Sequence, residues 1–331
     1  MIKKLVSLPI MLVGLLVPFL CESIVWGLEA QSLIASGSCI KPIGRVIKSL
    51  KSRQICEADE IEVNDNALVI CYSNQKFINL QSGLYKAASI CTLPETSTRR
   101  RCTPINRQDC PNRKGPGEDD NVPSIIQPYG NILIENRPLI SWSAVAGATS
   151  YSVQVKNGDM RWEKELEGTT LTLAYPEDQP ELLYGTAIRI VVMANKGKEP
   201  ISYDSLVVHL LREEKVTQIN QAVEQIKKLG LSADEAAYLD LDAVYMSEDI
   251  LNKTIEMLEE RVAAGSFNPS VYRILGDRYI EAWLPEKAKS AYIKALQLAR
   301  FQKNLEEVTL AQERLLALSQ SQLPTRINPA Q

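Results

Sequence analysis

The sequence predicts a multidomain protein that is all-β in its first two thirds and all-α after that. Three observations lead to this fold class. Six of the seven cysteines fall between Cys39 and Cys110, apolar side chains alternate at period two in short runs up to residue 211, and from Glu213 they recur at helical spacing. The first pattern is typical of a small disulfide-linked β module, the second of a β-sandwich and the third of packed helices. At 331 residues the chain is long enough for all three domains.

Residues 1–30 are expected to direct export. Two lysines precede an apolar run over residues 5–20, and a weak small-residue cleavage site follows at residues 28–30. The alternative is an uncleaved segment that anchors the chain in the membrane. In either case the rest of the chain is expected outside the cytoplasm, in the periplasm or on the cell surface.

The clustered cysteines predict disulfides. They are Cys39, Cys56, Cys71, Cys91, Cys102 and Cys110. An even number confined to one small region is typical of a disulfide framework in an oxidising compartment, and the pairing stays open. Zinc is the competing explanation, but the closest two of these cysteines are eight residues apart and no histidine is near.

Residues 31–102 are expected to form the disulfide-rich β module. Apolar residues alternate with polar neighbours around 61–63, 68–70 and 78–80, and turn-rich pieces separate these runs. Four short segments resemble the FecR-like β module of exported cyanobacterial proteins, in which it often precedes helical repeats: Gly44-Arg45-Val46, Cys56-Glu57-Ala58-Asp59-Glu60-Ile61, Ala67-Leu68-Val69-Ile70-Cys71 and Leu80-Gln81-Ser82-Gly83. That family takes its name from a signalling role, which no residue here indicates.

A linker is expected over residues 103–121, which are rich in proline and glycine. Residues 122–211 then carry several short strand-like runs at roughly ten-residue spacing, which indicates an Ig-like β-sandwich. The run from Ile140 to Val153 resembles the B–C hairpin of fibronectin type III-like domains, and the run from Tyr184 to Val192 resembles their F strand. Trp142, Trp162 and Tyr184 are expected in the sandwich core rather than as a sugar-stacking platform.

Helical periodicity covers residues 212–319, and residues 320–331 are expected to be a disordered tail. The expected helix starts are the capping box at Ser232, the acidic first turn at Ser247, the Asn268-Pro269 pair, Pro285 and Asn304.

This helical segment repeats at 34 residues, the period of tetratricopeptide (TPR) repeats. In the strongest copy, 269–302, seven residues resemble the pattern of that family: Tyr272, Leu275, Gly276, Tyr279, Ala288, Tyr292 and Ala295. Gly276 and Ala288 are expected to let two antiparallel helices approach closely. The preceding copy, 235–268, carries Asp242 and Arg261 at small-residue positions, so looser packing or a shift of register is expected there.

The TPR resemblance implies a concave face that binds an extended peptide. The residues that correspond to this face are Leu239, Ala243, Met246, Arg273, Asp277 and Ile280. The alternative is that a short helical array packs against the sandwich and presents no groove.

Composition argues against catalysis and against nucleic acid as a partner. The formal net charge is −3, whereas nucleic-acid-binding proteins usually carry a basic excess. His209 is the single histidine, no phosphate-binding glycine motif is present, and no cofactor or metal is expected. Two functions remain: a non-catalytic envelope scaffold that binds a protein or peptide partner, or an envelope protein whose disulfide-rich β domain senses a glycan or small molecule.

Overall fold

A computed structural model describes residues 41–49, 51–92, 102–109 and 119–321 of the chain. All of these belong to one compact unit, Cys39–Gln331. The predicted signal segment, Cys39 and Cys110 lie outside the described residues, as does most of the predicted tail. The first residues of that tail are not frayed, because the last helix runs to Ser321.

The β module contains an antiparallel sheet in the order β2-β1-β4-β5 and a separate strand pair, β3-β6. The strands of the sheet are β1 (Gly44–Lys48), β2 (Lys51–Ile55), β4 (Ala67–Cys71) and β5 (Lys76–Leu80), and the pair consists of β3 (Glu60–Val63) and β6 (Gly83–Lys86). The predicted runs correspond to β3, β4 and β5. A short helix, α1 (Ala87–Cys91), was not expected from the sequence.

A disulfide between Cys71 and Cys91 joins the end of β4 to α1 and closes the small core of the module. Cys56 and Cys102 are also disulfide-bonded. These bonds confirm the role predicted for the four described cysteines.

Strand β4 differs from the half-buried strand that was predicted, because all five of its residues are buried. Val69 and Cys71 pack into the core of the module. Leu68 and Ile70, on the other face, pack in an apolar cluster with residues of two later helices. The sheet is therefore covered on both faces.

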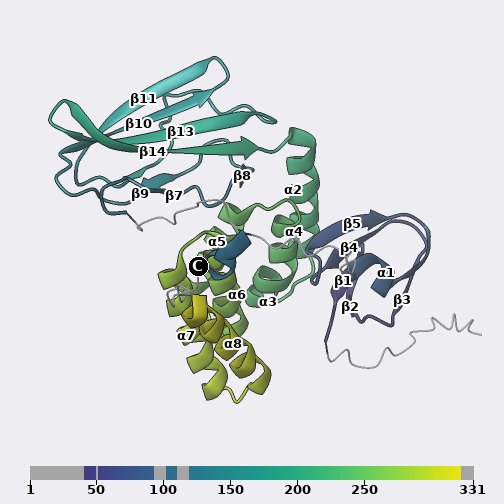
Figure 1. Cartoon of the computed structure of the whole chain (residues 1–331). Helices are drawn as coiled ribbons and strands as arrows, with labels where there is room; N and C mark the ends of the chain where they lie inside the picture. The colour runs from purple at the N-terminus through teal and green to yellow at the C-terminus, as the bar shows by residue number, and fades with distance from the viewer. Residues whose placement is uncertain (1–40, 50, 93–101, 110–118, 322–331) are drawn as a thin grey trace, which may run out of the picture. The chain divides into compact units, whose positions relative to one another are not determined.

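The sandwich has a five-stranded sheet, β11-β10-β13-β14-β8, and a three-stranded sheet, β12-β9-β7 (Figure 1). The strands are β7 (Ile125–Gln127), β8 (Ile132–Leu133), β9 (Ile140–Trp142), β10 (Ser150–Asn157), β11 (Met160–Glu167), β12 (Thr172–Leu173), β13 (Ala187–Lys196) and β14 (Glu199–Leu210). Side chains from both sheets form one core, in which Trp142 and Tyr151 lie with ring centroids 5.5 Å apart.

Two expectations for the sandwich were wrong. Strands β9 and β10 belong to different sheets, so they do not form a hairpin. Tyr184 lies in the turn before β13 and is 38% exposed, whereas Trp142 and Trp162 are buried in the core as predicted.

The helical region begins directly after β14. Its elements are α2 (Glu213–Lys227), α3 (Ala233–Glu235), a π-helical stretch η2 (Ala236–Leu241), α4 (Asp242–Met246), α5 (Leu251–Ala263), α6 (Pro269–Glu281), α7 (Pro285–Phe301) and α8 (Leu305–Ser321). Ser232 accepts a hydrogen bond from the Glu235 amide, and Asn268 caps α6 in the same way, as the sequence predicted. The helix start expected at Ser247 was wrong: Ser247 ends α4, and the next helix begins at Leu251.

Gly276 on α6 lies against the ring of Tyr292 on α7. A β-carbon added at Gly276 would lie 2.4 Å from Cε1 of Tyr292, far inside van der Waals contact. Tyr292 is fully buried, and its hydroxyl donates a hydrogen bond to Asp277. The close approach predicted for these two helices is therefore present, with an aromatic ring filling the space above the glycine.

Replacing Gly276 by alanine is expected to lower the free energy of unfolding by roughly 1–2 kcal/mol. The added methyl overpacks the α6–α7 contact, and this loss exceeds the gain in helix propensity of about 1 kcal/mol. Urea denaturation measures the difference. In a Tyr292→Leu background the same substitution should be neutral or stabilising, and a stabilising Gly276→Ala change in the wild-type background would contradict the packing.

Candidate functional site

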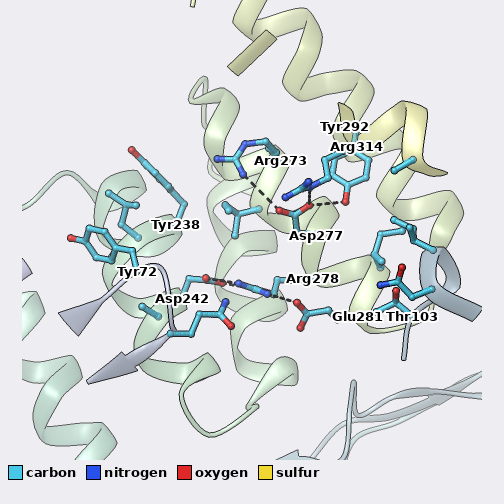
Figure 2. A pocket seen from close by; sticks show the side chains of 18 residues that line it. Tyr72, Thr103, Tyr238, Asp242, Arg273, Asp277, Arg278, Glu281, Tyr292 and Arg314 are labelled. Carbon is cyan, nitrogen blue, oxygen red and sulfur yellow. Dashed lines mark hydrogen bonds and ion pairs between the residues drawn. The ribbon is translucent and has the colours of Figure 1, made fainter. Parts of the chain in front are cut away.

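A cavity of about 630 Å³ opens along the helical region. Its walls come from the stretch η2–α4, from α6 and from α8, and it is bounded also by Tyr72 and Gln75 of the β module and by Thr103, Ile105 and Asn106. Figure 2 shows charged side chains from these helices converging on it. We call this cavity the helical groove.

Five of the six residues predicted for a concave binding face line the helical groove: Leu239, Ala243, Arg273, Asp277 and Ile280. The sixth, Met246, does not line it and is buried in the apolar core. Ala243 and Ile280 are also largely buried, so they form the floor of the groove rather than exposed contact points.

Arg273 and Asp277, which were expected to face a partner, are engaged with other side chains of the protein. Arg273 Nε lies 2.7 Å from Oε2 of Glu307 on α8. Asp277 Oδ1 accepts hydrogen bonds from the Tyr292 hydroxyl and from Arg314 Nε, each at 2.8 Å (Figure 2). These contacts join α6 to α7 and α8, so Arg273 and Asp277 hold the three helices together.

A second ion pair fills the site where the repeat pattern called for a small residue. Arg278 on α6 donates two hydrogen bonds to Asp242, at 2.8 and 2.7 Å, and both side chains are buried. Glu281 accepts a third hydrogen bond from Arg278 at 2.5 Å. The sequence showed that Asp242 was unusual at its position, but nothing in the pattern pointed to Arg278, which is 36 residues away.

A third acid–arginine contact joins α3 and η2 to the β module. Arg45 on β1 donates from Nε to Asp240 at 2.9 Å and from Nη2 to Glu235 at 2.6 Å. The Tyr72 hydroxyl donates to the same oxygen of Asp240 at 2.9 Å. Asp240 is fully buried, and its second carboxylate oxygen accepts no hydrogen bond from any of the described residues. Burial raises the pKa of this carboxyl, and the Arg45 charge opposes the shift.

The segment expected to be a linker takes part in this site. Residues Pro104–Asp109 form two short 3₁₀ turns joined by a kink at Asn106, and Thr103 and Pro104 are buried. Ile105 packs against the same apolar cluster as Leu275 and Ile280 of α6. The first residues of the predicted linker therefore lie against the helical groove.

All seven residues proposed for repeat packing are buried in the structure. They belong to two apolar clusters on α6 and α7, except Gly276, whose role is the contact with Tyr292 described above.

Other kinds of site receive no support from the described residues. No group of three or more histidine, cysteine or acidic side chains in the described ranges is arranged to hold a metal ion. None of the helices in the described part of the chain is both long and apolar enough to cross a bilayer. His209 is exposed on β14.

Acidification is expected to weaken the contact between α6 and α8. Burial alone would raise the pKa of Glu307, but hydrogen bonds from Arg273 and Ser270 and the Arg273 charge outweigh it and hold the pKa below its usual range. A depressed pKa contributes stability that is present above the unfolded value, about 4.3, and is lost as the pH falls through the folded value. Glu307→Gln should therefore destabilise the protein at pH 7 and flatten the loss of stability below about pH 4.5. Thermal unfolding across pH measures this, and parallel curves for the two proteins would contradict it.

No family model and no curated protein matches the chain. Among solved structures, it is similar to a two-domain fibronectin type III segment of chicken tenascin (13% identity, 44% of this chain and 63% of that one, TM-score 0.22). It is also similar to the fn3 domain of the human collagen α-1(XX) chain (15% identity, 30% of this chain and 95% of that one, TM-score 0.22). A further similar structure contains domains FN1–FN3 of chicken CNTN1 (11% identity, 48% of this chain and 45% of that one, TM-score 0.20).

Proposed function

We propose that this protein is a non-catalytic, exported envelope scaffold whose TPR-like helices bind an extended peptide segment of a protein partner. The observation that carries the proposal is the position of Thr103–Asn106. This segment of the chain itself bounds the helical groove together with five residues that the TPR resemblance assigned to peptide binding.

The contact of Ile105 with the helices supports this proposal in particular. Ile105 is partly buried against the cluster formed by α5, α6 and α7, while Thr103 and Pro104 beside it are buried. A short segment that inserts one apolar side chain into a groove between helices uses the same contacts as a bound peptide would. The segment belongs to the same chain, so it occupies the groove at a high effective concentration.

The charges in the groove favour binding over catalysis. The carboxylates of Asp242, Asp277 and Glu281 all accept hydrogen bonds from arginines. A general acid or base must reach a substrate proton, and these carboxylates are already held in ion pairs. Recognition in the groove therefore rests on shape and apolar contact.

Export and the FecR-like character of the β module are part of the proposal. The disulfides support export, because such bonds persist in oxidising compartments such as the periplasm. The alternative function, recognition of an envelope glycan or small molecule by this module, has less support, because β4 is buried on both faces.

Binding of a labelled peptide with the sequence of residues 103–109 tests the proposal. Ile105→Asp should release the resident segment, because it places a charge against an apolar cluster. This variant is expected to bind the peptide about tenfold more tightly than the wild type, equivalent to about 1.4 kcal/mol. Fluorescence anisotropy measures the affinity.

Two further substitutions complete the test. Leu239→Lys, added to Ile105→Asp, should abolish peptide binding because Leu239 lines the groove. Leu316→Lys is the matched control, since Leu316 on α8 is 58% exposed and does not line the groove. No peptide binding by the Ile105→Asp protein, or equal binding by the Leu239→Lys protein, would exclude the groove as a peptide site.

A further inference from the structure

The solvent face of the five-stranded sheet carries a row of three positive charges. Lys156 on β10 lies directly opposite Arg161 on β11, and also directly opposite Arg189 on β13. Directly opposed residues on neighbouring strands have β-carbons about 4.5–5.5 Å apart, at which like charges repel. All three side chains are exposed.

Among the residues that the structure describes, no carboxylate relieves this repulsion by direct contact. Within the described residues, none of the three cations takes part in an ion pair shorter than 4.0 Å. The nearest link is indirect: Gln154 accepts a hydrogen bond from Arg161 at 3.4 Å and donates one to Glu163 at 3.0 Å. The helical groove is different, because each of its arginines is matched by a carboxylate.

The row forms one side of a hollow of about 400 Å³. Beside the cations, this hollow is lined by Val191, Met193 and Tyr203, which lie on β13 and β14. Tyr203 is directly opposite Met193 and is 65% exposed, and Val207, opposite Arg189, is 48% exposed. A charged end and an apolar end therefore meet on the same open surface.

The geometry points to a binding surface for an acidic peptide segment that carries apolar side chains beside its acidic residues. The three cations lie on adjacent strands about 4.8 Å apart, so the row extends over about 10 Å. In an extended peptide, alternate side chains on one face are about 6.6 Å apart, so two alternate carboxylates fit within the length of the row. The apolar part of the peptide lies over Val191, Met193 and Tyr203, away from the carboxylates of β11. This surface is separate from the helical groove and does not depend on the function proposed for it.

The probe is a synthetic peptide with glutamates at alternate positions followed by leucines at alternate positions. The full chain is titrated with it by calorimetry, beside the same peptide with glutamines and an oligomer of uronic acids. Binding is expected for the glutamate peptide alone, and its affinity should fall as salt is added because the attraction is between exposed charges.

Substitutions locate the surface. Lys156→Gln combined with Arg189→Gln is expected to weaken peptide binding about tenfold or more. Tyr203→Ala should weaken it severalfold through loss of apolar contact. Lys198→Gln removes one positive charge in the exposed β13–β14 turn, outside the row, and should leave binding unchanged.

Folding of the variants is checked independently. Removing Lys156 relieves like-charge repulsion, so the melting temperature of the double variant should stay the same or rise. Weaker peptide binding with an unchanged or higher melting temperature supports the inference. Equal binding by the double variant, absence of peptide binding, or preference for the uronic acid oligomer would each overturn it.

Discussion

The buried ion pair between Arg45 and Asp240 joins the first strand of the β module to the helical region, and much of the remaining structure depends on it. Asp240 is fully buried, and its charge is compensated by Arg45 and by the Tyr72 hydroxyl. Removing one member of such a pair costs about 3–5 kcal/mol because the other charge stays buried without a partner. The pair therefore couples two parts of the chain that are 195 residues apart.

The helix that carries Asp240 also carries Asp242, and the two carboxylates face opposite ways. Residues two apart on a helix differ by about 200° in direction, so Asp240 meets Arg45 while Asp242 meets Arg278 of α6. The π-helical turn lies directly before Asp242 and adds a residue to the helical turn. Residues 235–268, which were predicted as the weaker repeat copy, depart from the small-residue pattern at Asp242 because an ion pair occupies the space.

Charge is used differently on the two candidate binding surfaces. In the helical groove, Arg273, Arg278 and Arg314 are neutralised by acids of neighbouring helices, which holds the walls of the groove together. On the sandwich, strand register places Lys156, Arg161 and Arg189 side by side, with no direct counter-charge from the described part of the chain. Peptide binding in the groove would then depend little on salt, whereas binding to the sheet would depend strongly on it.

The sequence by itself determined the local elements and their order. Alternation predicted the strands around Val69 and Val153, helical spacing and caps predicted the helices that begin near Ser232 and Asn268, and the glycine at 276 predicted the close α6–α7 contact. These features depend on residues that are close in the chain or on a short repeat, so the spacing of apolar and small residues is enough to predict them. Only the tertiary structure decided that β4 is covered on both faces, that Arg45 meets Asp240 and that residues 103–106 bound the groove. The physical reason is that these contacts join segments far apart in the chain, and no local propensity or spacing encodes which buried arginine meets which carboxylate.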